Sequence, residues 1–236
     1  MKMEFQMYDK LLQLPLFQGL GKNEFTQIIE KVKLHFHKYS KDAIIAREEE
    51  ACKKLIFILD GEVLYEAYDP DQKYMLQETI KAPHIIEPYS LFGLKPYYSA
   101  TYFASTETNV LTIDKKYLLI NLRLYDIFML NYLNMLSSRA QMLNKKLWDV
   151  RIGNTYEKII SFLTLRCNTQ QGPKTLYVKM EDFAEMLTDT RLNISTALND
   201  MQDNGLIKLS RKKILVPELA TLIDFCKNKK KKETNK

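Results

Sequence analysis

The sequence predicts an α+β protein in which a β-rich N-terminal domain, a long helix, and a helix–turn–helix with a β-hairpin follow one another. Three observations carry this prediction. Short segments rich in Ile, Phe, Tyr, Val and Thr fill residues 34–113. Apolar residues return to helical spacing from residue 115, and two helices and two short strands follow between residues 180 and 216. We expect domains at 1–120 and 153–236, with the long helix and a hinge at 121–152 between them.

Composition and charge restrict the class of protein. Of 236 residues, 46% are apolar and 27% are charged, which is the balance of an ordinary globular chain. No apolar run reaches the length of a membrane span, and the first ten residues lack the apolar core of a signal peptide, so we expect a cytoplasmic protein. Residues 1–150 are neutral, whereas residues 151–236 carry 16 basic and 10 acidic side chains, which favours a polyanionic partner.

Glycine and proline divide the N-terminal region into short elements. A helical stretch at 8–31 contains breaks at Pro15 and at Gly19–Gly21. Asp60 and Gly61 join two β-rich runs within Lys53–Tyr68, which is the pattern of a two-residue hairpin turn. Further strands are expected at Tyr74–Ile80, Thr101–Ala104 and Val110–Ile113, which together predict a small barrel or roll.

The long helix has an apolar seam of three heptads. A helix that packs on the core of its own domain is one interpretation. A dimer seam is the other, favoured by the strict 3.5-residue period and by the small Ala140 at its centre, which permits close approach of two helices. The segment Arg151–Thr155 is the expected hinge. The residues of the seam are Met129, Leu133, Leu136, Ala140, Leu143, Leu147 and Val150.

The C-terminal region follows the plan of a winged helix-turn-helix. Helices are predicted at Met180–Leu187 and Arg191–Asn204, with Gly205 as the residue that ends the second helix. Strands are predicted at Leu206–Leu209 and Lys213–Val216. The Lys227–Lys236 segment adds further basic charge, and a solvated terminal tail is an equally good interpretation of it.

The second helix of this motif carries side chains that can read DNA. Arg can bond guanine and Asn can bond adenine in bidentate fashion, and hydroxyl groups suit bases or phosphates. The basic tip of the following hairpin is placed to meet phosphates beside the groove. An ordinary helical hairpin with a polar face is the alternative. The candidate DNA-binding residues are Arg191, Leu192, Asn193, Ser195, Thr196, Asn199, Arg211, Lys212 and Lys213.

Enzymatic and metal sites are poorly supported. His35 and His37 share a face of a predicted strand, but no further ligand motif accompanies them. Cys52, Cys167 and Cys226 are too few and too scattered for an iron–sulfur cluster or a planned disulfide. No phosphate-binding or hydrolase motif occurs. We therefore expect no catalytic residue, no metal site and no enzyme.

The order of these elements resembles the Crp/Fnr superfamily of bacterial transcription regulators. Four segments in the family's order carry the resemblance, and they cover nearly the whole chain: Leu14–Ile29, Lys53–Tyr68, Tyr102–Leu118 and Met180–Val216. The resemblance implies a double-stranded β-helix (jelly-roll-like) sensor domain of the cyclic nucleotide-binding type, a dimerisation helix, and a winged helix-turn-helix that binds DNA.

The sensor region departs from members that bind cyclic AMP. Those members place an arginine against the cyclic phosphate, and Tyr98 stands at that position here, followed by the retained Ser99. A buried phosphate without a paired cation is costly to desolvate, so cyclic AMP is not expected in the usual mode. The family's N-terminal cysteine cluster is also missing. The resemblance gives as effector-pocket candidates Ile86, Glu87, Tyr98, Ser99 and Thr101.

The sequence therefore predicts a homodimeric, sequence-specific transcription regulator that binds double-stranded DNA and responds to an unidentified effector. RNA polymerase is a further partner if the protein is an activator, and no membrane partner is expected. Leu192 and Thr196 differ from the best-known members, so a different operator is expected. The alternative is a cyclic-nucleotide-type sensing module that acts through protein partners.

Overall fold

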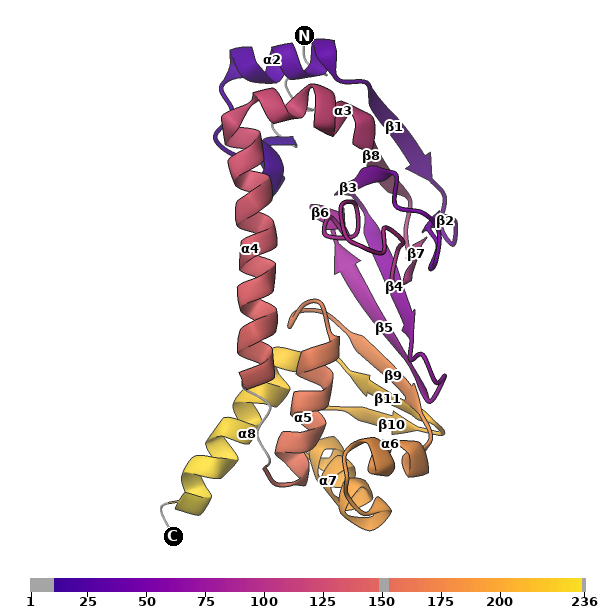
Figure 1. Cartoon of the computed structure of the whole chain (residues 1–236). Coiled ribbons are helices and arrows are strands. Elements are labelled where there is room, and N and C mark those ends of the chain that lie inside the picture. Colours follow the sequence, from indigo (N-terminus) through magenta and orange to yellow (C-terminus); the bar gives the residue numbers. More distant parts are fainter. Residues whose placement is uncertain (1–10, 149–152, 235–236) are drawn as a thin grey trace. The chain divides into compact units, whose positions relative to one another are not determined.

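The computed structural model describes residues 11–148 and 153–234, which form two compact units (Figure 1). One unit contains the residues up to Leu64 and Ile80–Gln141, and the other contains Tyr65–Thr79 and the residues from Met142 onward. The predicted α+β fold class is confirmed, since a β-rich region, a long helix and a helix-turn-helix region follow in order. No described helix combines the length and the apolar character that a membrane span requires.

The first unit begins with two short helical elements, η1 (Pro15–Phe17) and α2 (Lys22–Lys31). Of the two predicted breaks, Pro15 begins η1, and Gly19–Gly21 lies between η1 and α2. The part of the predicted helix before Leu11 lies outside the described residues. Glu24 closes the start of α2, because its Oε2 accepts a hydrogen bond of 2.9 Å from the Gly21 N–H.

Eight strands, β1 to β8, follow along the described chain, and the parts of β4 and β5 within Tyr65–Thr79 belong to the second unit. One sheet has the order β1-β8-β3-β6, and β2 pairs with β7 around an irregularity at Ile44/Ala46. Phe17 packs against Phe57 and Phe128 with ring centroids 5.5 and 5.7 Å apart, and all three rings are buried in the core. The strands are β1 (Leu34–Tyr39), β2 (Ile44–Ala46), β3 (Lys54–Asp60), β4 (Glu62–Tyr68), β5 (Tyr74–Lys81), β6 (His84–Ile86), β7 (Thr101–Ala104) and β8 (Thr108–Asp114).

The prediction of a β-hairpin at Asp60–Gly61 is wrong. Strands β3 and β4 belong to different sheets, with β3 between β8 and β6 and β4 between β5 and β7. Gly61 is the corner at which the chain passes from one sheet to the other, with a φ of 96° that favours glycine. Asp60–Gly61 gives the correct position of the chain reversal, but the partner of each strand depends on contacts distant in sequence.

The first unit ends with α3 (Lys115–Ile120), η2 (Leu122–Leu124) and most of the long helix α4 (Asp126–Trp148). One face of α4 packs on its own unit through Phe128 and Tyr132, which are buried. The Tyr132 hydroxyl donates a hydrogen bond of 2.7 Å to the Pro88 carbonyl, and Phe92 contacts the Tyr132 ring edge-on at 6.0 Å.

The second unit is a helical core beside an antiparallel sheet, in which β9, β10 and β11 are extended by the end of the β4–β5 hairpin (Figure 1). Its core includes Ile159, Phe162, Phe183 and Leu198, all buried. The predicted helices and strands of this region are confirmed to within three residues. The elements are α5 (Thr155–Arg166), β9 (Lys174–Val178), α6 (Met180–Met186), α7 (Arg191–Asp203), β10 (Lys208–Ser210), β11 (Lys213–Val216) and α8 (Leu219–Thr234).

Helix α8 was not predicted. Leu219 and Leu222 are buried in the core of the unit, with Ile223 and Cys226 packed against them. This spacing of three and four residues is the signal of an amphipathic helix. The helical backbone continues to Thr234, and the lysine side chains of this segment lie outside the described residues.

Candidate nucleic-acid interface and sensor site

Helix α7 packs on the core through its apolar side, and capping residues define both of its ends. Its buried residues are Ile194, Ala197, Leu198 and Met201. Thr190 begins the helix, because its Oγ1 accepts a hydrogen bond of 3.1 Å from the Asn193 N–H. At the other end, Gly205 adopts a φ of 70°, as predicted for the residue that follows a helix.

The opposite side of α7 is exposed and carries polar side chains together with Leu192. The candidate residues Arg191, Leu192, Asn193, Thr196 and Asn199 are exposed, and Ser195 is half-buried. Burial of the apolar side therefore leaves the six predicted residues on the side of α7 away from the core.

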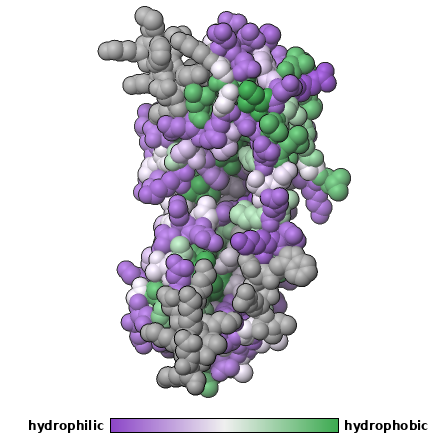
Figure 2. Space-filling view, turned by 90° about the vertical axis from the view of Figure 1, so that its left-hand side faces the viewer, coloured by the Kyte–Doolittle hydropathy of each residue, from purple (hydrophilic) through white to green (hydrophobic). Residues whose placement is uncertain are grey.

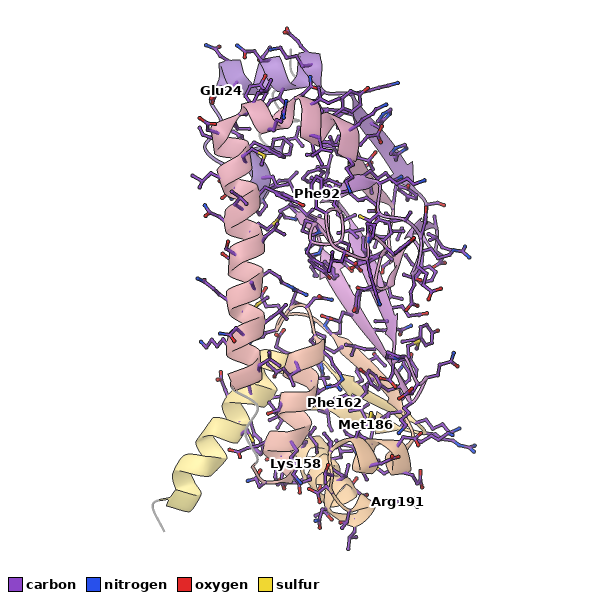
Figure 3. All side chains as sticks on the ribbon, in the orientation of Figure 1. Glu24, Phe92, Lys158, Phe162, Met186 and Arg191 are labelled. Atoms are coloured by element: carbon purple, nitrogen blue, oxygen red, sulfur yellow. The ribbon has the colours of Figure 1, made fainter. Side chains whose placement is uncertain are left out.

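Arg191 is engaged by a carboxylate of the preceding helix. Its Nη1 lies 3.0 Å from Glu181 Oε1, and both side chains are largely exposed. Figure 3 places Arg191 at the outer end of the helix-turn-helix region. An exposed ion pair of this kind contributes little to stability, so the guanidinium can exchange Glu181 for a phosphate or a base edge.

The carboxylate of Asp189 joins the starts of two helices. Its Oδ2 accepts hydrogen bonds of 3.0 Å from Thr155 Oγ1 and 3.0 Å from Lys158 Nζ, both on the first turn of α5. Its Oδ1 accepts hydrogen bonds of 2.8 Å from the Thr190 N–H and 2.8 Å from Asn193 Nδ2. These donors, with the Asn193 amide first and Lys158 next, hold the pKa of Asp189 far below its usual range.

The hairpin of β10 and β11 presents the basic candidates. Ser210 pairs with Lys213, and the turn between them contains Arg211 and Lys212, which are exposed. Lys212 adopts a φ of 57°. Lys213 is half-buried, and its Nζ lies 5.5 Å from the centroid of the Tyr177 ring.

In the sensor region, Glu87 is a buried carboxylate surrounded by donors of its own unit. Its side chain is 2% exposed. Ser99 donates to it twice through its N–H, at 3.1 and 2.9 Å, and once through Oγ at 2.8 Å. Ser90 Oγ donates at 2.8 Å and the Tyr102 hydroxyl at 3.1 Å. Both oxygens of Glu87 are therefore occupied.

The other sensor candidates, Tyr98, Thr101 and Ile86, contact residues other than Glu87. The Tyr98 hydroxyl lies 3.4 Å from the Lys54 carbonyl, and burial followed by the nearby Cys52 raises the pKa of Tyr98 far above its usual range. Thr101 Oγ1 accepts a hydrogen bond of 3.1 Å from the Glu48 N–H. Ile86 is buried opposite Ile56 in the sheet. Of the five candidates, only Glu87 and Ser99 are joined by hydrogen bonds that the described structure shows.

The predicted seam of α4 lies on a different face from the buried one. Leu133, Leu143 and Leu147 are 54%, 43% and 67% exposed, Ala140 is exposed, and Met129 and Leu136 are half-buried. At 100° per residue, this seam is roughly 90° around the helix from Phe128 and Tyr132. In Figure 2, viewed from the side of α4, apolar residues lie among hydrophilic ones. Val150 lies outside the described residues.

The histidines and cysteines considered as metal ligands do not form a metal site among the described residues. His35 and His37 stack at 6.3 Å on β1, and no cluster of three metal-ligating side chains occurs among residues 11–148 and 153–234. Cys52 and Cys167 are buried, and burial raises the pKa of Cys52.

Sequence reasoning missed Asp189 and Lys158. The spacing of Asp189 and Asn193 by four residues, across the start of a predicted helix, was a local signal for their contact. Lys158 had no local signal, because it meets Asp189 only through the packing of α5 against the helix-turn-helix.

Comparison with known proteins relates both regions to described families. The cyclic nucleotide-binding domain family matches residues 36–122, and the Crp-like helix-turn-helix domain family matches residues 157–225. A comparison with curated proteins found no match.

The chain is similar to several solved structures. The catabolite activator protein of Thermus thermophilus is 17% identical with a TM-score of 0.49, covering 89% of this chain and 97% of that chain. The c-di-GMP responsive global regulator CLP of Xanthomonas campestris is 15% identical with a TM-score of 0.49, covering 84% and 99%. DNR of Pseudomonas aeruginosa is 17% identical with a TM-score of 0.44, covering 92% and 96%.

The two family matches follow one another along the chain, with the sensor-type domain before the helix-turn-helix domain. Crp/Fnr transcription regulators are a family without enzymatic activity. The chain belongs to the Crp/Fnr family of DNA-binding transcription regulators, with a cyclic nucleotide-binding-type sensor domain and a Crp-like helix-turn-helix domain.

Proposed function

We propose that the protein is a homodimeric, sequence-specific transcription regulator that reads operator DNA with the start of α7. The exposed polar side of α7 carries this proposal. Arg191, Asn193, Thr196 and Asn199 are exposed, while the apolar side of the helix is fixed in the core. A rigid helix with this division fits the major groove, where Arg and Asn distinguish base pairs by bidentate hydrogen bonds.

The wing supplies binding energy without sequence preference. Arg211 and Lys212 are exposed at the tip of the β10–β11 hairpin. Cations at this position suit backbone phosphates, whose neutralisation releases counterions and makes affinity depend on salt. Base reading by α7 and phosphate binding by the wing therefore predict two different responses to mutation.

Dimerisation through α4 is the second part of the proposal. The buried face of α4 already accounts for packing on its own unit, and the heptad seam is a separate, largely exposed apolar face. A second copy of the same seam would cover it, with Ala140 at the point of closest approach. Two copies would present two α7 helices to two half-sites.

The sensor domain responds to an effector other than a cyclic nucleotide bound in the usual mode. Glu87 already accepts five hydrogen bonds from Ser90, Ser99 and Tyr102. A ribose hydroxyl would therefore have to displace a donor. Tyr98 adds no cation for a phosphate, and its buried phenol stays neutral.

Selection from a random DNA pool with the full-length protein tests the DNA proposal. The selected operator and a scrambled duplex are then titrated at several salt concentrations. We expect Arg191→Ala to cost about 1–3 kcal/mol on the operator and less on the scrambled duplex. Lys212→Gln should weaken binding to the operator and to the scrambled duplex equally. It should also lower the slope of log affinity against log salt concentration by about one unit.

Three results would contradict the proposal. Recovery of no preferred sequence would favour a module that acts through protein partners. Equal losses on both duplexes for Arg191→Ala would make this residue a phosphate contact. Micromolar binding of cyclic AMP in calorimetry, with a matching gain in DNA affinity, would overturn the inference about the sensor.

A further inference from the structure

We propose that Asp189 is a positioning residue for base reading, which fixes the amide of Asn193 so that this side chain selects adenine. The inference rests on the proposed function, because it assumes that the start of α7 meets base edges. Neither residue is a contact within the hydrophobic core. Asn193 is exposed on the first turn of α7, and Asp189 lies in the turn before it.

Each oxygen of Asp189 serves a different helix. Oδ2 is held from the α5 side by Thr155 Oγ1 at 3.0 Å and Lys158 Nζ at 3.0 Å. Oδ1 faces α7 and accepts from the Thr190 N–H and Asn193 Nδ2, both at 2.8 Å. Lys158 also donates to the Thr188 carbonyl at 3.0 Å, so the turn that carries Asp189 is itself held. The carboxylate therefore has a fixed position relative to α7.

The chemistry of the pair determines which way the Asn193 amide points. An ionised carboxylate only accepts hydrogen bonds, so its partner must be the nitrogen end of the amide. A freely rotating amide would present its oxygen or its nitrogen at the same place. With Nδ2 held against Asp189, the side chain keeps one orientation before DNA arrives, and the cost of ordering it is already met within the protein.

The remaining hydrogen-bonding groups of Asn193 match one base. Nδ2 retains a second N–H, and among the described residues no hydrogen bond to Asn193 Oδ1 is shown. One acceptor and one adjacent donor are complementary to N6–H and N7 of adenine. Guanine offers two acceptors on this edge, so it cannot satisfy the amide oxygen.

The position of Asp189 has a cost that a role in capping alone does not explain. Thr190 Oγ1 already accepts the Asn193 N–H, which is the usual function of the residue that begins a helix. A carboxylate at the DNA-facing end of the helix repels phosphates, and Lys158 at 3.0 Å offsets this charge. Beside its bonds to Thr155 and Lys158 of α5, Asp189 therefore adds a contact with the Asn193 amide that capping does not require.

The matched variants are Asp189→Asn and Asp200→Asn. Asp189→Asn keeps the size of the side chain but removes the acceptor-only partner, so the Asn193 amide loses its fixed orientation. Asp200 holds a similar pair at the far end of the same helix, where its Oδ1 accepts from Asn204 Nδ2 at 3.3 Å. Its substitution alters a carboxylate–amide pair of α7 without reaching Asn193.

The experiment measures base preference at every operator position, using the selected operator and duplexes with single base changes. We expect the wild type to prefer adenine at one position by roughly 5- to 150-fold. Asn193→Ala and Asp189→Asn should each abolish most of this preference, and their combination should lose no more than Asn193→Ala alone. Asp200→Asn should leave the preference unchanged. Circular dichroism of all variants shows that they fold.

The outcomes separate this inference from the proposed function. A wild-type protein without any base preference overturns the proposed function itself. A selective wild type whose preference Asn193→Ala lowers, but Asp189→Asn does not, overturns the role of Asp189 alone. Equal effects of Asp189→Asn and Asp200→Asn, or additive losses in the double variant, would reduce Asp189 to a structural residue. A preference for another base would overturn the assignment of adenine.

Discussion

At the scale of single residues, neighbouring groups satisfy the buried charges of Glu78 and Lys174. Glu78 and Lys174 form a fully buried pair with 3.4 Å between Oε2 and Nζ. Glu78 Oε1 also accepts from the Asn168 N–H at 2.7 Å, and Lys174 also donates to the Gln171 and Gly172 carbonyls at 2.6 and 3.1 Å. The pair joins β5 to β9 and to the loop before β9. We therefore expect the pairing of the two charges to determine how stably β5 and β9 are attached to each other.

Lys174→Met should destabilise the second unit by about 3–5 kcal/mol, because it leaves a buried carboxylate without its cation. Combined with Glu78→Gln, the loss should be clearly smaller, since no charge then remains buried. Hydrogen exchange of the β9 amides measures both effects in the full-length chain. Equal losses for the single and the double variant would show that the charge balance is not what holds the strand.

His84 predicts a dependence of stability on pH in the first unit. Burial, and then the charge of Arg139, lower the pKa of His84 from 6.5 to about 4. Between these pH values His84 is protonated in the unfolded chain but neutral in the folded one. The contribution of His84 to stability therefore rises with pH from about 4 to about 6.5 and does not change above that range. The total change is at most about 3 kcal/mol.

Urea unfolding at several pH values checks this expectation, with His84→Gln as the comparison. The variant should lose the part of the slope that lies between pH 4 and 6.5. Retention of the full slope would assign it to carboxylates instead of His84.

At the scale of elements, the predictions that succeeded rest on local signals. Helix α7 was placed correctly because Thr190 begins it, Gly205 ends it, and its apolar residues repeat at helical spacing. The partners of β3 and β4 were beyond such signals, because Asp60–Gly61 specifies a chain reversal but not which sheet receives each strand. The contact of Lys158 with Asp189 spans 31 residues of sequence and likewise follows from packing.

The corner at Gly61 gives a prediction at this scale. A Cβ on Gly61 would lie 2.6 Å from the Glu107 carbonyl oxygen and 2.8 Å from Thr108 Oγ1, and the φ of 96° adds conformational strain. Gly205 also has a positive φ, of 70°, but a Cβ there would meet nothing within 4 Å. Gly205→Ala should therefore cost about 1 kcal/mol, and Gly61→Ala substantially more.

Hydrogen exchange read separately in the β3–β8 pair and in α7 measures both costs. Similar losses at the two glycines would mean that the backbone conformation alone, and not the close approach of Glu107, requires glycine at the corner.

At the scale of the whole molecule, the seam of α4 should decide whether two chains act together. Leu136→Lys places a charge at the centre of the proposed interface, where burial without a partner is costly. We expect the variant to sediment as a monomer and to bind the selected operator much more weakly, because a single α7 reads one half-site. Ser138→Lys is the matched control, since Ser138 is exposed on the side of α4 opposite the seam. It should remain dimeric and bind the operator as the wild type does.

Two results would contradict this prediction. A Leu136→Lys protein that stays dimeric would place the dimer interface elsewhere. A monomeric variant with undiminished operator affinity would show that DNA reading does not depend on dimerisation.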